Sequence, residues 1–84
     1  MVYRKLEIEF SSKSLQKINN LPYATRFFVV QALNFFAGTS QELREKHYRF
    51  DHDAFEIGIG DVGRLLVDVD EEEGVVRILD FRFF

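Results

Sequence analysis

The alternation of apolar and polar residues predicts one strand at the start of the chain and three near its end. Apolar and charged residues alternate over about residues 2–10, the period-two pattern of a half-buried strand. Three further apolar runs, at 55–59, 65–69 and 75–81, are separated by short turns that contain Gly and Asp. Consecutive strands with such turns form a β-meander, so we expect the end of the chain to weave back and forth.

A short helix is predicted directly after the first strand. Ser11 or Ser12 provides the side-chain oxygen that caps the first free N–H groups of a helix. Leu15 and Ile18, three residues apart, are expected to point inward, and Asn19-Asn20 is expected to end the helix.

A second, longer helix is predicted to run to about Ala37. Pro22 suits its first turn, where the missing N–H has no partner in any case. Gly38 is expected to close the helix as a left-handed C-cap. The charged segment that follows is expected to be irregular, with a short helical turn at 41–46.

This second helix carries more apolar residues than one buried stripe requires. They are Tyr23, Ala24, Phe27, Phe28, Val29, Val30, Ala32, Leu33, Phe35 and Phe36. A single sheet cannot cover all of them. The helix is therefore either enclosed within its own fold or partly covered by another chain or by the C-terminal tail, and both interpretations stay open at this point.

The predicted element order is β-α-α-β-β-β, which gives an α+β domain spanning residues 1–84. We expect two helices packed on one face of a small, twisted, mostly antiparallel sheet. The chain has 84 residues and no cysteine, and no apolar run is long enough to cross a bilayer. The N-terminus has alternating charges instead of a signal-peptide pattern, so we expect a cytoplasmic protein that does not associate with membranes.

The charge distribution argues against broad nucleic-acid binding. The formal net charge is −3, with a balance of +4 over residues 1–49 and −7 over residues 50–84. Proteins that bind nucleic acids through phosphate contacts need a basic face. Such a patch could come only from the N-terminal helices.

Several local phrases, taken in order, resemble the RelE/ParE superfamily of bacterial toxin–antitoxin toxins over nearly the whole chain. The phrases are Phe10-Ser11-Ser12 followed by Leu15, then Leu21-Pro22, Ala54–Gly60, Gly60-Asp61 leading to Arg64–Asp70, and Val75–Leu79. The resemblance implies helices packed on one face of a small twisted sheet. We expect no small-molecule cofactor and no metal.

Ribonuclease members of that superfamily cut messenger RNA on the ribosome, and the resemblance implies where their site would lie. Attack by a 2′-hydroxyl needs a general base, an acid for the leaving oxygen and cations for the phosphate. Two positions that commonly carry such groups fall on Glu56 and Gly58, which cannot supply a cation. The remaining basic positions match Arg64 and, with an offset, Arg82, and the sequence ends at Phe84 without the terminal Tyr of the family pattern.

The resemblance implies a cognate antitoxin as the first partner, and ParE-like members poison DNA gyrase without that RNA-cutting set. We expect a partner interface formed by aromatic residues of the second helix and the tail, and a homodimer stays open. The residues are Phe27, Phe28, Phe35, Phe36, Phe81, Phe83 and Phe84.

Three functions follow as hypotheses. The leading one is a toxin-like component that acts by protein binding, on its antitoxin and on a target such as gyrase. The second is an atypical ribosome-dependent endoribonuclease that uses Arg64 and Arg82, with His47 or His52 as a substitute base. The third is a degenerate family member that serves only as an interaction module.

Three other motifs are interpreted as structural. Gly58-x-Gly60-x-x-Gly63 matches a dinucleotide-binding pattern, but a strand follows it where that motif needs a helix. The acidic segment 68–74 lacks the Gly and Glu spacing of a calcium loop, so we interpret it as a solvated turn. The His and Asp residues of 47–53 have no strong ligand spacing and are interpreted as a surface loop.

Overall fold

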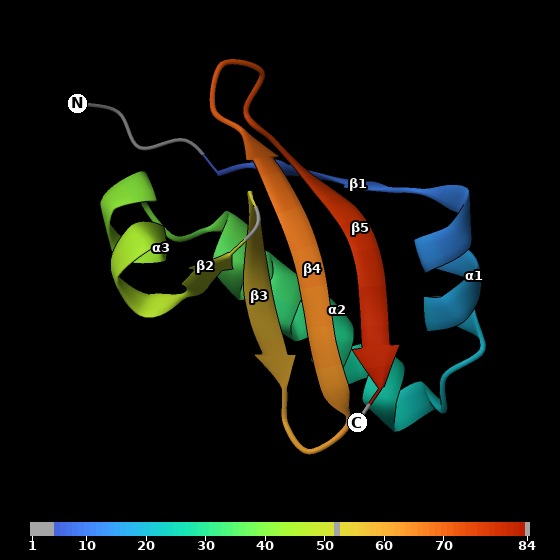
Figure 1. Ribbon diagram of the computed structural model, residues 1–84. Helices are drawn as coiled ribbons and strands as arrows, with labels where there is room; N and C mark the ends of the chain where they lie inside the picture. The colour runs from blue at the N-terminus through green and yellow to red at the C-terminus, as the bar shows by residue number, and fades with distance from the viewer. Residues whose placement is uncertain (1–4, 52, 84) are drawn as a thin grey trace.

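The computed structural model describes residues 5–51 and 53–83, in which three helices pack on a five-stranded mixed sheet (Figure 1). The elements in chain order are β1 (Glu7–Phe10), α1 (Ser12–Asn19), α2 (Tyr23–Ala37), α3 (Gln41–His47), β2 (Arg49–Asp51), β3 (Ala54–Ile59), β4 (Gly63–Asp70) and β5 (Val75–Phe83). The predicted α+β class is confirmed, as are both early helices and the helical turn after them. The first strand is shorter than predicted, and residues 1–4 lie outside the described part.

The sheet has the strand order β1-β5-β4-β3-β2. β3, β4 and β5 are antiparallel neighbours, which confirms the predicted meander. β1 pairs with β5 in parallel. The helices that follow β1 carry the chain across the sheet to the opposite edge, where β2 and β3 begin, and a parallel pair requires a long crossover connection of this kind. The short strand β2 pairs with the first half of β3 and was not predicted.

The helix α1 begins and ends where the sequence predicts. The side chain of Ser11 accepts a hydrogen bond from the backbone N–H of Ser14, and Asn20 is the C-cap. Ile18 is buried as expected, but Leu15 is exposed, so the predicted inward pair is half wrong. The second inward residue is Ser14, four residues before Ile18 and therefore on the same face of the helix.

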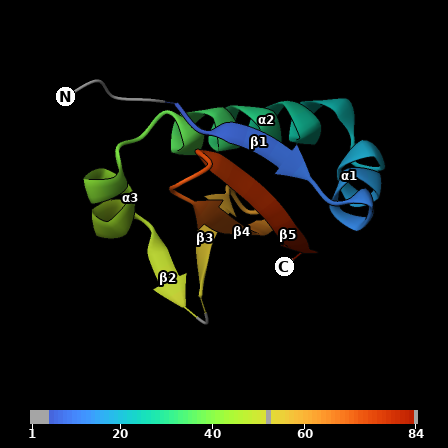
Figure 2. The same ribbon diagram turned by 90° about the horizontal axis from the view of Figure 1, so that it is seen from above.

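The helix α2 crosses one face of the sheet, and the opposite face is not covered by any described helix. Figure 1 shows α2 behind the strands, and Figure 2 shows it on one side of them. Pro22 immediately precedes the helix and is its N-cap. Gly38 closes it with a φ of −86°, so the predicted left-handed cap is wrong. The N–H of Gly38 still donates to the carbonyl of Asn34, which continues the helical pattern by one residue.

The helix α3 is held by a buried arginine that the sequence pattern did not indicate. Arg44 lies over the ring of Phe36, 5.7 Å from its centroid, and donates to the carboxylate of Glu71 at 2.6 Å. It also donates to the backbone carbonyl of Thr39. These contacts join α3 to both α2 and the β4–β5 turn.

One apolar core lies between α2 and the sheet. Phe36 and Phe81 are almost completely buried in it. This corrects the expectation that these two residues belong to a partner interface, because their rings are already covered by the protein itself. The core consists of Leu6, Ile18, Leu21, Val29, Leu33, Phe36, Ala37, Phe55, Ile57, Ile59, Leu65, Val67, Val76, Ile78 and Phe81.

Candidate functional site

The open face of the sheet brings together the strand positions singled out in the sequence. Gly58 of β3 is the register partner of Arg64 of β4, and Arg64 is the register partner of Arg82 of β5. Residues paired in this way across neighbouring strands point to the same face. The two predicted arginines are therefore neighbours, and they lie on the side opposite α2.

Glu56 occupies the same face, two residues before Gly58. Its carboxylate is 3.2 Å from Nη1 of Arg64. The Glu56 side chain is half-buried, and that of Arg64 is 39% exposed. A carboxylate thus stands beside the arginine on the open face.

Gly58 leaves free space in front of this arginine. A Cβ built on Gly58 meets no atom within 4 Å, and its φ is not in the left-handed region. Neither packing nor backbone conformation therefore requires a glycine here. Glycines within strands often mark a place where a ligand approaches the backbone closely.

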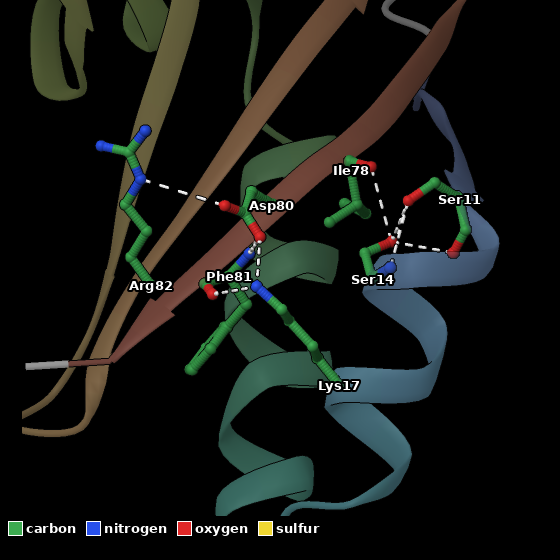
Figure 3. Close-up of polar contacts among 7 residues, drawn as sticks. All are labelled: Ser11, Ser14, Lys17, Ile78, Asp80, Phe81 and Arg82. Carbon is green, nitrogen blue, oxygen red and sulfur yellow. Dashed lines mark hydrogen bonds and ion pairs between the residues drawn. The ribbon is translucent and has the colours of Figure 1, made fainter.

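Asp80 connects Arg82 to the helix α1. The ammonium group of Lys17 donates to one carboxylate oxygen at 2.7 Å, and Nε of Arg82 lies 4.0 Å from the other oxygen (Figure 3). The hydrogen bond from Lys17 lowers the pKa of Asp80; partial burial opposes this shift, and the backbone N–H of Phe81 adds to it. Asp80 is therefore an ionised bridge between two cations from different elements.

The histidines do not join this cluster. His47 ends α3 and lines a groove together with Phe35 and Leu43, apart from the open face that carries Arg64. His52 lies outside the described residues. In residues 5–51 and 53–83, no three His, Asp or Glu side chains are close enough to hold a metal ion.

A second surface of interest is the outward side of α2. Its large apolar side chains are well exposed, up to 77% for Tyr23 and 72% for Phe35. Phe27 and Phe28 are also exposed and contact each other edge to face, with centroids 6.4 Å apart. Phe83 is exposed at the end of β5 and contacts the buried ring of Phe81, whereas Phe84 lies outside the described residues.

Two grooves adjoin this helix surface. One lies between Phe28 and the β3–β4 turn, where Gly60 and Val62 form its far wall. The other lies between Phe35 and α3, where Leu43 contributes an exposed apolar side chain. Phe28 and Phe35 are seven residues apart and therefore on the same side of α2, so the two grooves follow each other along that side of the helix.

No protein-family model and no curated protein sequence matches the chain, but solved structures match it over almost its full length. A chain of the toxin–antitoxin complex RelBE2 from Mycobacterium tuberculosis is 19% identical with a TM-score of 0.76, covering 95% of this chain and 92% of that one. The fold is RelE-like. The RelE–RelB complex from Pyrococcus horikoshii OT3 gives 13% identity and a TM-score of 0.72, with coverage of 95% and 96%.

The intact RelBE complex from Escherichia coli gives 18% identity and a TM-score of 0.72, with coverage of 94% and 96%. At these identities the likeness is one of fold. In this chain one sheet face is left open by the described helices, and on that face lie Arg64 and Arg82. No helix in the described part of the chain is long and apolar enough to span a membrane.

Sequence reasoning missed two members of the open-face cluster, Lys17 and Asp80. Both are ordinary charged residues in their own segments, separated by 63 positions. The only local signal is the spacing of Lys17 three residues after the inward-facing Ser14. That spacing alone could not have identified Asp80 as the partner of Lys17, because the contact depends on the position of α1 against β5.

Proposed function

We propose that this protein is the toxin-type component of a type II toxin–antitoxin system and that a cognate antitoxin is its first partner. The observation that carries the proposal is the uncovered aromatic surface of α2 on a RelE-like fold. Two of the similar structures are toxin–antitoxin complexes and the third is a RelE–RelB complex, which supports a partner of the same kind here.

The composition of α2 supports a partner on the outward side of this helix. A helix that is apolar on all sides is normally buried on all sides. Only one side of α2 faces the core, where Val29 and Leu33 are buried. The outward aromatics leave several large apolar side chains of one helix exposed to water, and exposed apolar surface of this kind marks sites of protein association.

The two grooves along α2 suit an amphipathic helix. Helix-in-groove recognition places apolar residues of a partner helix into a preformed apolar channel. Phe28 and Phe35 each stand at the edge of one groove, and seven residues separate them, which is two helical turns. A partner helix along α2 would contact both residues.

Expression of the chain in bacteria, with and without the product of an adjacent reading frame, tests the proposal. We expect growth arrest with the chain alone and normal growth when the antitoxin is produced with it. The Phe28→Asp and Phe35→Asp variants should remain toxic but should not be rescued. Rescue of both variants to the wild-type level would remove α2 from the interface, and the absence of growth arrest would favour the interaction-module alternative.

A second function, RNA cleavage, is favoured by the alignment of Arg64 with Arg82 on the open face. Two neighbouring guanidinium groups are suited to the charge that develops on a phosphate during 2′-hydroxyl attack. Glu56, beside Arg64, is the carboxylate placed to accept a proton. Translation-dependent cleavage of messenger RNA that is lost in Arg64→Ala would establish this activity.

Poisoning of DNA gyrase is the alternative activity of a toxin that acts by binding. It predicts double-strand DNA breaks on expression, with messenger RNA intact and toxicity unaffected by Arg64→Ala. The two outcomes exclude each other in one experiment, because RNA and DNA integrity can be followed in the same culture.

A further inference from the structure

The end of the β5 strand lies beside the helix α1, and this contact brings a lysine to the open-face arginines. β1 pairs with β5 only as far as Phe10 opposite Ile78. Beyond that point α1 lies against the edge of β5, as Figures 1 and 3 show. Side chains from α1 can therefore reach around this edge to the face that carries Arg82.

The position of Lys17 is fixed by the way in which α1 is anchored. Ser14 is fully buried, and its hydroxyl lies 3.5 Å from the carbonyl oxygen of Ile78 and 3.0 Å from that of Ser11. Lys17 follows one helical turn after Ser14, and Asp80 follows two residues after Ile78. The helix α1 and the strand β5 therefore run side by side here. The Lys17–Asp80 contact is a second attachment between them, next to the contact of Ser14 with Ile78 (Figure 3).

We propose that Lys17 is a third cation of the open-face site, and that Lys17, Arg64 and Arg82 together bind the phosphodiester groups of a single-stranded nucleic acid. The proposal rests on the proposed use of the open face, but it does not depend on cleavage.

The cations keep donors available for such a ligand. An ammonium group has three N–H donors, and Lys17 directs donors to Asp80 and to the carbonyl of Phe81. Arg82 approaches Asp80 only through Nε, and its Nη atoms lie on the side away from the carboxylate (Figure 3). No ion pair of these Nη atoms is found within the described residues.

Two features favour a ligand with several phosphates over a single phosphate ion. Lys17 and Arg82 approach different oxygens of Asp80, so the two cations are separated by the carboxylate and do not converge on one point (Figure 3). Arg64 adds a third position on the neighbouring strand. A chain of phosphates can contact the three cations in succession.

The acidic character of the C-terminal half does not cancel this site. The acidic turn at Glu71–Glu73 precedes β5, whereas Arg82 is near the other end of that strand. At about 3.3 Å per residue, the two ends of β5 are roughly 25 Å apart. This separation exceeds the Debye length of about 8 Å at physiological ionic strength, so the turn acts weakly on the cations.

Fluorescence anisotropy with a short labelled 2′-O-methyl RNA, which resists 2′-hydroxyl attack, tests the proposal directly. A labelled DNA strand of the same sequence is measured in parallel. The comparison of the two affinities shows whether the sugar of the ligand affects binding. We expect Lys17→Gln to weaken binding about 3- to 10-fold and to reduce the slope of log affinity against log salt by about one. Lys17→Arg should bind like the wild type, because it keeps the charge.

Lys46→Gln is the matched control, since Lys46 is an exposed lysine on a different helix, α3. It should bind RNA like the wild type. The proposal is overturned if the wild type shows no binding at low salt, or if Lys17→Gln and Lys46→Gln weaken binding equally. Growth arrest without RNA binding would reject this inference and leave the proposed toxin function intact. RNA binding through Lys17 without growth arrest would support this inference and reject the proposed toxin function.

Discussion

Arg64 lies directly opposite Arg82 on neighbouring antiparallel strands. Like charges in register across a sheet destabilise it, usually by a few tenths of a kcal/mol. Glu56 and Asp80 offset part of this repulsion, at 3.2 Å from Arg64 and 4.0 Å from Arg82. A pair of cations placed in this way serves the binding of an anion better than it serves folding.

The repulsion between Arg64 and Arg82 should have a measurable cost in the stability of the fold. We expect Arg82→Gln to raise the free energy of unfolding by about 0.2–0.5 kcal/mol, because it removes the repulsion with Arg64. The gain should be larger at low ionic strength, where the charges are less screened. Urea denaturation at two NaCl concentrations measures this, and a clear loss of stability in both would contradict the explanation.

Two glycines of the meander give a matched pair of substitutions. A Cβ at Gly63 would overlap the backbone carbonyl of Arg82, so we expect Gly63→Ala to cost about 1–3 kcal/mol. A Cβ at Gly58 meets no atom, and Gly58→Ala should be neutral or stabilise by up to about 1 kcal/mol. Equal effects in thermal denaturation would show that the β4–β5 approach is not as close as described.

The two neighbouring aromatics at the end of α2 should behave in opposite ways. Phe36 is completely buried, and Phe36→Ala should cost about 3–5 kcal/mol. Phe35 is 72% exposed, and Phe35→Ala should change stability by less than about 0.5 kcal/mol. Chemical denaturation compares the two directly. A large loss in Phe35→Ala would mean that this ring supports the fold and does not await a partner.

The Lys17–Asp80 contact predicts a pH dependence with a definite sign. The pKa of Asp80 is lowered by Lys17, so the contact stabilises the fold above the unfolded-state pKa of about 3.9. This stability is lost as the pH falls through the lower, folded-state pKa. We expect Asp80→Asn to be less stable than the wild type by about 0.5–1.5 kcal/mol at neutral pH, with the difference vanishing in acid.

Asp61→Asn provides the control for that experiment. Asp61 is exposed in the β3–β4 turn and forms none of the contacts described for Asp80. Its substitution should change stability little at neutral pH. If both variants lost the same stability, the effect would reflect net charge and not the contact with Lys17.

Local patterns in the sequence determined most of the elements. The alternation of apolar residues and the turn residues between Ile59 and Val75 specify the meander, because each strand must bury one face. Ser11 and Asn20 mark the two ends of α1 through local hydrogen bonds that need no tertiary partner. Even the excess of aromatic residues on α2, and the question of what covers them, could be stated from the sequence.

Tertiary structure alone decided which of those residues are buried and which charges meet. Phe35 and Phe36 are identical in type and adjacent in sequence, yet only the position of α2 on the sheet makes one a core residue. The alignment of Arg64 with Arg82 depends on strand register, and the contact of Lys17 with Asp80 depends on where α1 lies against β5. Both join residues far apart in the chain, and no local pattern encodes a distance that arises only from packing.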